Sequence, residues 1–231
     1  MNELRFPPLM QGEPCTEDSF ATACRRAVLS CDSGLVCYSL DAPQLEAAIV
    51  LAPDVPLRQA MTMLPLCGVS FQNALGALAP PEVAVHLGWD GTLYINGARC
   101  GALRAASDTS DLDAVPGWLV IGLALPLWPS EDPGLTPDRT ALYAEGCADV
   151  QPGDIIEGWA RHTLNWITRW EDEGPRVLHA EWRGLAQGLG EETAQGGLSG
   201  TFAGVDENFG MLLRNGPDTH LIPLTTLLEQ P

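Results

Sequence analysis

The chain has 231 residues, which is enough for one domain of ordinary size with a small appendage and a substantial buried core. Its formal net charge of -18 argues against a nucleic-acid partner, because phosphate binding depends on clustered Lys and Arg. The apolar run over residues 118–128 is broken by Gly122 and Pro126, and it is too short to span a bilayer. The first residues lack the apolar core of a signal peptide. The sequence therefore predicts a cytoplasmic protein without a membrane partner.

The basic and sulfur-containing residues narrow the chemistry. All 12 basic residues are arginines, so any step that needs a lysine falls to arginine. The 7 cysteines are odd in number and form no C-x-x-C pair, which predicts neither a disulfide framework nor a zinc site. They are Cys15, Cys24, Cys31, Cys37, Cys67, Cys100 and Cys147. No two histidines have metal-ligand spacing, so we expect no transition metal.

The first half of the chain alternates between helical and strand patterns. Thr16–Ser30 opens with a capping residue and carries Phe20 and Cys24 on one helical face. Leu57–Leu78 has a helical pattern that we expect to be kinked or interrupted at Pro65. The turn Asn96-Gly97 between two apolar runs predicts a β-hairpin. The predicted strands are Gly34–Tyr38, Leu45–Leu51, Glu82–Leu87, Thr92–Ile95 and Cys100–Arg104.

The second half predicts one buried strand, two helices and a β-rich end. Residues 118–125 form a continuous apolar run, as expected of a central strand buried on both faces. An apolar stripe predicts a helix from Asp154 to Gly174, and a second helix follows over Pro175–Leu189. After a glycine-rich stretch come short strands, which are typical of a small β-barrel. They are Gly200–Gly204, Gly210–Arg214 and Thr219–Pro223.

Four stretches, in this order, carry a resemblance to a known family. They are Trp89–Leu103, matching K-W-P-N-D-I-x-x-N-G-x-K-x-A-G-I-L without its first lysine; Val120–Pro126, matching V-V-x-G-I-G-L-N; Arg139–Leu142 with the later Trp166, Trp170, Glu173-Gly174 and Trp182-Arg183 pattern; and Gly200–Asp206, matching G-T-A-x-G-I-D. With them the chain resembles the biotin protein ligase and lipoate–protein ligase family over nearly its full length. The resemblance implies an α+β fold with a mixed β-sheet flanked by helices. We expect a ligase-like catalytic domain at 1–190 and a small β-barrel domain at 191–231.

The resemblance also implies a reaction. Members of this family use ATP, and with it Mg, to activate a carboxylic acid such as biotin, lipoate or octanoate, and they pass the acyl group to a carrier-protein lysine. Arg99 stands at the position of a family lysine and could hold a carboxylate or phosphate bidentately. His86 precedes the signature as a candidate proton-bearing group. The candidate ligand-binding residues are Trp89, Asp90, Asn96, Gly97, Gly101, Gly122 and Ala124.

Other positions depart from the family pattern. The family's G-R-G-R-x-G-R loop is replaced by Ser39–Gln44, which contains no Gly and no Arg. Gly88 stands in place of the first lysine, and Pro126 in place of an asparagine. These departures leave two hypotheses: an acyl-activating or acyl-transferring enzyme, and a non-catalytic pseudoenzyme that binds an acyl ligand or has a regulatory role.

Each candidate also has a plain alternative. Arg99 could be a solvated hairpin residue, and Trp89 could be a core residue. Cys100 beside Arg99 is a possible nucleophile for a thioester, since octanoyltransferases of this fold use cysteine. A strand cysteine packed in the core is the favoured alternative for Cys100.

Overall fold

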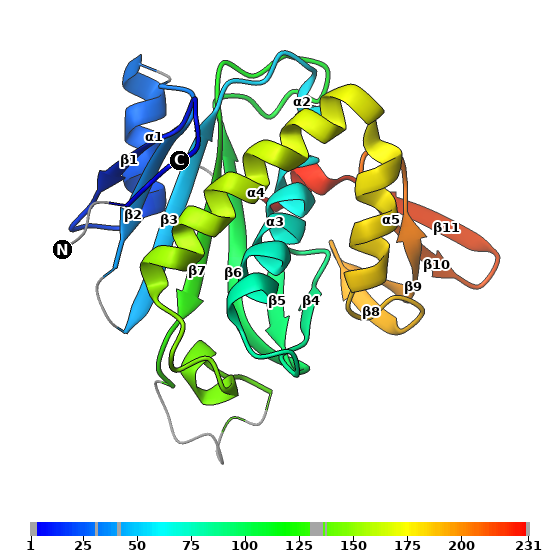
Figure 1. Ribbon diagram of the computed structural model, residues 1–231. Helices are drawn as coiled ribbons and strands as arrows, with labels where there is room; N and C mark the ends of the chain where they lie inside the picture. The colour runs from blue at the N-terminus through cyan, green and yellow to red at the C-terminus, as the bar shows by residue number, and fades with distance from the viewer. Residues whose placement is uncertain (1–3, 31, 41–42, 130–135, 137, 230–231) are drawn as a thin grey trace.

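The computed structural model describes residues 4–30, 32–40, 43–129, 136 and 138–229. A large mixed sheet forms its centre, with the strand order β1-β2-β3-β7-β6-β5-β4 (Figure 1). These strands are β1 (Gln11–Pro14), β2 (Leu35–Ser39), β3 (Gln44–Leu51), β4 (Val85–Leu87), β5 (Thr92–Ile95), β6 (Ala98–Ser107) and β7 (Leu119–Pro126). A short strand, β12 (Leu228–Glu229), pairs with β6. The β1–β2 and β6–β12 pairs are parallel and the others antiparallel, which confirms a mixed sheet.

Helices cover both faces of this sheet. One face packs against α1 (Ser19–Ser30), which contacts β2, β3 and β7. The other face packs against α3 (Met63–Leu78), with α4 (Pro152–Glu173) and α5 (Pro175–Leu185) lying over it. The remaining helical turns are α2 (Leu57–Ala60), η1 (Leu142–Glu145) and η2 (Leu224–Leu227). The predicted arrangement of helices around a mixed sheet is confirmed.

The C-terminal strands form an open sheet, so the predicted β-barrel is wrong. Its strand order is β11-β10-β9-β8, and β8 and β11 are its edges. The strands are β8 (Glu192–Gln195), β9 (Leu198–Val205), β10 (Met211–Asn215) and β11 (Asp218–Ile222). Phe202, Leu213 and Ile222 are buried in the same apolar cluster as the core of the large sheet. The sheet therefore buries its apolar side against the rest of the molecule and does not need to close on itself.

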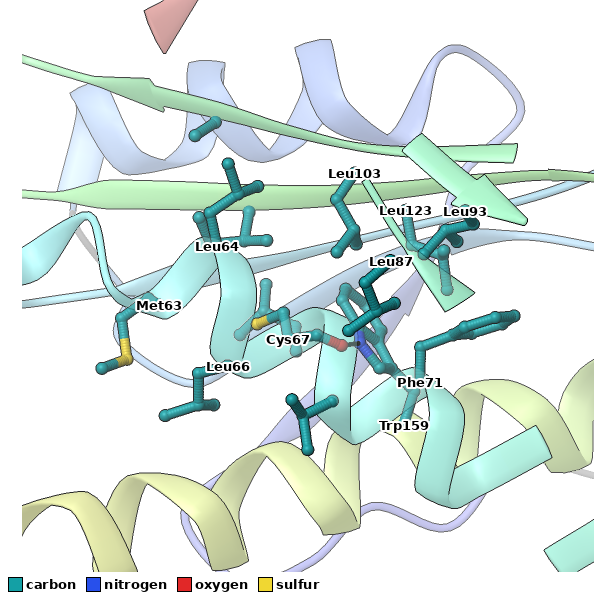
Figure 2. Packing of buried hydrophobic residues seen from close by; sticks show 14 of the residues in the cluster. Met63, Leu64, Leu66, Cys67, Phe71, Leu87, Leu93, Leu103, Leu123 and Trp159 are labelled. Atoms are coloured by element: carbon teal, nitrogen blue, oxygen red, sulfur yellow. Dashed lines mark hydrogen bonds between the residues drawn. The ribbon is translucent and has the colours of Figure 1, made fainter. Parts of the chain in front are cut away.

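The main core lies between the large sheet and the helices α3 and α4. Figure 2 shows Leu87, Leu93 and Leu103 of the sheet facing α3. Trp159 of α4 is fully buried, and its indole N–H donates a 3.0 Å hydrogen bond to the Cys67 carbonyl of α3. A smaller apolar cluster, which includes Phe20, lies between the sheet and α1. Each face of the sheet thus has its own apolar cluster.

Some predicted helices and strands differ from the observed ones in their boundaries, and three short strands were not predicted. The helical run over 57–78 is broken before Met63 rather than at Pro65, which is the third residue of α3, where a proline fits. The N-terminal helix begins at Ser19, and Asp18 caps it by accepting a 2.9 Å hydrogen bond from the Ala21 N–H. Strands β1, β8 and β12 were not predicted, because they are short and lack an alternating apolar pattern.

Candidate functional site

A β-bulge in β6 aims Arg99 at the face of the sheet that packs against α1. Tyr94 pairs with Arg99, but the preceding Leu93 pairs with Gly101, so Cys100 is the extra residue. In a regular strand Arg99 and Arg104 would point to opposite faces. The bulge reverses that alternation and places Arg99 with Tyr94, while the Cys100 side chain joins the core on the other face. Strand alternation alone would place the two arginines on opposite faces, so the sequence does not show this arrangement without the bulge.

Backbone and side-chain contacts hold Arg99 in place. Its N–H donates to the Asp138 carbonyl at 2.9 Å, and its carbonyl accepts from the Thr140 N–H at 2.8 Å. The guanidinium carbon lies 6.0 Å from the centre of the Tyr94 ring, and a Tyr94 hydrogen bond raises the pKa of Arg99. The Asp90 carboxylate lies 4.0 Å from the guanidinium. The Arg99 side chain is 51% exposed, so a permanently charged group stays open to solvent and ligand.

Arg99 lines a cavity of about 440 Å³ at the ends of β3, β6 and β7. Small-molecule binding sites usually have volumes of about 300–1,000 Å³, so this cavity is large enough for a small ligand. Among the described residues, two arginines line the cavity together with polar and apolar residues. The lining residues are Pro43, Gln44, Thr92, Arg99, Cys100, Gly101, Ala102, Pro126, Trp128, Pro129, Thr136, Arg139 and Thr140. Arg99 and Arg139 form an isolated parallel bridge, so two cationic residues are neighbours at this cavity of a strongly acidic chain. We name it the Arg99 cavity.

The predicted hairpin turn anchors the segment that carries Arg139. Asn96 and Gly97 have φ values of 50° and 89°, the left-handed pair that a two-residue hairpin turn requires. The Asn96 amide donates to Glu145 at 2.7 Å, and the Thr140 hydroxyl donates to the same carboxylate at 2.5 Å. Glu145 therefore fastens the turn to the segment beside Arg99. This placement gives Asn96 and Gly97 a structural task at the border of the cavity.

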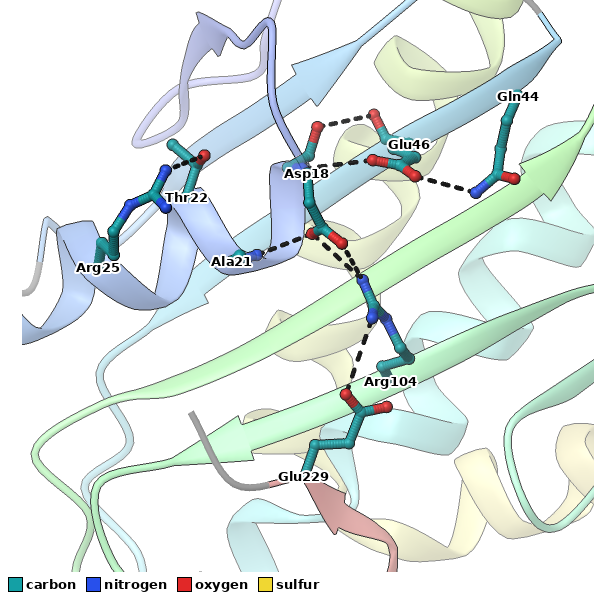
Figure 3. Close-up of polar contacts among 9 residues, drawn as sticks. Asp18, Ala21, Thr22, Arg25, Gln44, Glu46, Arg104 and Glu229 are labelled. Carbon is teal, nitrogen blue, oxygen red and sulfur yellow. Dashed lines mark hydrogen bonds and ion pairs between the residues drawn. The ribbon is translucent and has the colours of Figure 1, made fainter.

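A polar network covers the centre of the sheet on the α1 face (Figure 3). Arg104 contacts Asp18 at 3.3 Å and Glu229 at 3.7 Å, and it lies 4.4 Å from the centre of the Phe20 ring. The Asp18 pKa lies below its usual value of 3.8: burial alone would raise it, but the Ala21 N–H and Arg104 outweigh that effect. Arg104 therefore ties the start of α1 to β12, whereas Arg99 faces the cavity.

The other predicted site residues lie around the cavity or in the packing. Gly101 lines the cavity, and Ala124 pairs with Ala102, which also lines it. Gly122 makes room for α1, since a Cβ there would lie 2.5 Å from the Phe20 ring. His86 is the cross-strand neighbour of Tyr94, and its buried Nδ1 has no partner among the described residues. The structure places His86 one strand beyond the Tyr94–Arg99 pair, outside the cavity lining.

Trp89 and Cys100 point to the opposite side of the sheet. Trp89 is 5% exposed, and its indole N–H donates a 2.7 Å hydrogen bond to the Phe209 carbonyl, which docks the C-terminal sheet. Cys100 is 1% exposed. Burial raises the pKa of the Cys100 thiol to about 12, and the Glu145 carboxylate adds to the shift. A thiol with that pKa is protonated at neutral pH, which leaves it a poor nucleophile.

Gln44, Tyr94, Trp128 and Arg139 were missed as site residues by sequence reasoning. Gln44 and Trp128 reach the cavity from the ends of two neighbouring strands, and Arg139 from a segment beyond the sheet. Arg139 lies in a family-like stretch, but nothing in the sequence paired it with Arg99. Tyr94 pairs with Arg99 only because of the bulge, so the strand pairing expected for a regular hairpin does not place Tyr94 beside Arg99.

Metal and membrane sites find no support in the described parts of the chain. Among those residues no cluster of His, Cys, Asp or Glu has the geometry of a metal centre. The six cysteines described are free thiols, and Cys31 lies outside the described residues. No helix in the ranges given above has the length and apolar character needed to cross a bilayer. For the replaced family loop, Asp41 and Ala42 also lie outside the described residues.

Two family models match the chain. The first is described as the biotin/lipoate A/B protein ligase family and matches residues 6–184. The second is described as a domain of unknown function and matches residues 189–230. The chain therefore belongs to the biotin/lipoate A/B protein ligase family. A comparison with curated proteins found no match.

Solved structures share the fold at high and at low sequence identity. A biotin protein ligase-like protein of unknown function from Silicibacter sp. TM1040 is 62% identical, with 98% of this chain and 100% of that chain covered and a TM-score of 0.94. The biotin protein ligase from Aquifex aeolicus in complex with biotin and ATP is 16% identical, with 92% and 95% covered and a TM-score of 0.71. The Leishmania major enzyme in complex with biotinyl-5-AMP is 13% identical, with 94% and 99% covered and a TM-score of 0.60. The two ligases show the fold alone.

Proposed function

We propose that this chain binds a small carboxylic acid, of the class that includes biotin, lipoate and octanoate, in the Arg99 cavity. The observation that carries the proposal is the placement of Arg99 and Arg139 side by side at a cavity of about 440 Å³ in a chain of net charge -18. A guanidinium fork binds a carboxylate through two parallel hydrogen bonds. Arg99 is the residue we expect to hold the acid, with Gly101 and Ala124 near its path.

Binding is tested by titration calorimetry with biotin, lipoate and octanoate. Arg99→Ala removes the fork, and we expect the best-bound acid to lose roughly 10- to 100-fold in affinity, as for a charged hydrogen-bonded pair. Arg99→Lys keeps the charge and loses the fork, so it should recover only part of that loss. Arg214→Ala is the matched control, because Arg214 is an exposed strand arginine in the C-terminal sheet. Equal affinity in wild type and Arg99→Ala would contradict the proposal.

A second candidate is activation of the same acid by ATP and its transfer to a carrier domain. Family membership over residues 6–184 favours it, and the two arginines at the cavity could reduce repulsion between a carboxylate and a phosphate. Against it, the chain contains no lysine, and the replacement of the family's Gly-Arg loop removes several cations. The Cys100 burial also gives no support to a thioester route.

Acid-dependent exchange of labelled pyrophosphate into ATP separates the two candidates. The assay is run with Mg, with each acid in turn, and with the Arg99→Ala and Arg214→Ala variants. Exchange with one acid that is lost only in Arg99→Ala would establish the ligase reaction. Binding without exchange in folded protein would leave a non-catalytic acyl-binding protein, which is the outcome that we expect.

A further inference from the structure

Gln44 lies at the wall of the Arg99 cavity nearest β3. It is the first residue of β3 and pairs with Pro126, the last residue of β7. Its side chain is partly buried and contributes to the cavity lining. A polar amide therefore meets any ligand that extends from Arg99 toward β3.

The neighbouring Glu46 fixes which end of that amide faces its own side chain. Glu46 Oε1 accepts a 2.9 Å hydrogen bond from Gln44 Nε2, and Glu46 Oε2 accepts a 3.3 Å hydrogen bond from the Ser19 N–H. An ionised carboxylate only accepts hydrogen bonds, so the Gln44 amide nitrogen has to point toward Glu46. The Gln44 carbonyl oxygen then turns away from Glu46, as Figure 3 shows. The end of the amide directed away from Glu46 is therefore its acceptor oxygen.

Gln44 and Arg99 lie at opposite sides of the cavity. Gln44 pairs with Pro126, and two residues earlier on β7 Ala124 pairs with Ala102 of β6. The strand β7 thus separates the strand of Gln44 from the strand of Arg99, and two strand spacings amount to about 10 Å. Pro43, Pro126 and Trp128 supply an apolar wall of the same cavity. An elongated acid fits this order of groups, with its carboxylate at Arg99 and its far end at Gln44.

We propose that Gln44 selects acids that carry an N–H or O–H donor at the end remote from the carboxylate. This inference rests on the proposed function, because it takes the carboxylate to lie at Arg99. A remote donor satisfies the Gln44 carbonyl, whereas an alkyl end displaces water from that oxygen and leaves it without a partner. The ligand class is therefore a small carboxylic acid with a hydroxyl, amide or urea group at its far end, rather than an unsubstituted fatty acid.

The test compares three probes of one backbone: octanoate, its ω-hydroxy derivative and its ω-methoxy derivative. The hydroxy compound can donate, while the methoxy compound can only accept. Titration calorimetry with the wild-type chain should show the hydroxy derivative binding roughly three- to tenfold more tightly than the other two, as expected for one added hydrogen bond.

Two variants change what Gln44 presents. Gln44→Leu removes the acceptor, so the advantage of the hydroxy derivative over octanoate should disappear. Glu46→Gln keeps an acceptor for the Ser19 N–H but turns an amide N–H toward Gln44, which has to flip and present its own N–H to the cavity. In that variant the methoxy derivative should bind more tightly than octanoate. Gln11→Leu is the control, since Gln11 is an exposed residue of the edge strand β1.

The outcomes separate this inference from the proposed function. Equal affinity for all three probes in the wild type, with a loss of affinity in Arg99→Ala, would overturn the role of Gln44 and leave carboxylate binding in place. A hydroxy preference that survives in Gln44→Leu would overturn it as well. If Arg99→Ala changes no affinity, or if no acid binds to the folded chain, both proposals fail. Thermal unfolding of each variant shows whether it is folded.

Discussion

The two faces of the large sheet are formed by the same strands but have different chemistry. Toward α3 and α4, residues such as Leu93, Leu103 and Leu123 are almost completely buried in one apolar cluster. Toward α1, the facing residues include Arg99, Arg104 and Gln44, which make polar contacts or line the cavity. In a strand, neighbouring residues alternate between faces, so one strand can serve the core and a site together.

The fold does not depend on Arg99 for its stability, although this arginine is half-exposed at the cavity. The face toward α3 supplies most of the buried apolar area that stabilises the fold, and the face toward α1 adds a smaller apolar cluster around Phe20. The half-exposed ion pairs of Arg104 contribute only modestly. Changes on the α3 side should therefore alter stability, and changes at Arg99 should alter binding.

Trp159→Ala should have the largest effect on stability. It removes a fully buried indole and the hydrogen bond to the Cys67 carbonyl, and such changes cost about 3–5 kcal/mol of unfolding free energy. Urea unfolding gives the value. Leu29→Ala on α1 is the comparison, because Leu29 is 80% exposed and its loss should change the free energy little. Similar losses in both variants would contradict the dependence of stability on the burial of these side chains.

Arg99→Ala should change binding and leave stability almost unaltered. The side chain is 51% exposed, and among the described residues it pairs with Asp90 at 4.0 Å, so its removal should shift the urea midpoint little. The same variant should lose roughly 10- to 100-fold in acid affinity. A large loss of stability would mean that Arg99 belongs to the packing rather than to a site.

Asp18→Asn should lower stability by less than about 1 kcal/mol at neutral pH, since its ion pair with Arg104 is partly exposed. The pKa of Asp18 is lower in the folded chain than its usual 3.8, so its contribution is present above that pH and is lost as the pH falls through the lower, folded value. Urea unfolding of both chains should show a difference at neutral pH that shrinks in acid. A difference that grows in acid would contradict the assignment.

Asp90→Asn should produce the smallest effect, and it should increase acid affinity where Arg99→Ala decreases it. The Asp90 carboxylate lies 4.0 Å from Arg99 and competes with a bound acid for its charge. Its neutralisation should tighten acid binding by roughly two- to threefold, because the pair is half-exposed. Titration at low and high salt checks the cause, since added salt should reduce the gain. Weaker binding in Asp90→Asn would show that Asp90 positions Arg99 rather than competing for it.

The sequence predicted the parts of the fold that depend on local pattern. The apolar run at 118–125 and the turn at Asn96-Gly97 correspond to β7 and to the β5–β6 hairpin. Closure of a sheet is not a local property, so the strand pattern after residue 198 could not distinguish an open sheet from a barrel. Contacts with α5 hold the open sheet against the rest of the molecule. The His179 ring stacks on the Phe209 ring with 3.9 Å between ring centres, and the Trp182 ring meets Phe209 edge-on at 5.7 Å.

For the site, the sequence identified Arg99 but not its surroundings. The motif position gave the residue, while its direction depends on one extra residue in β6, and its neighbours Gln44 and Arg139 come from distant segments. Trp89 matched the family signature, yet it docks the C-terminal sheet. Spacing along the chain does not reveal such contacts between segments far apart in sequence.

A crystal structure of the chain with ω-hydroxyoctanoate bound tests most directly whether an acid binds between Arg99 and Gln44. We predict that the carboxylate lies within hydrogen-bond distance of the Arg99 guanidinium and that the hydroxyl lies against the Gln44 carbonyl. An acid bound away from Arg99, for example in the groove beside α1 lined by Phe20, Val28 and Leu29, would contradict the account.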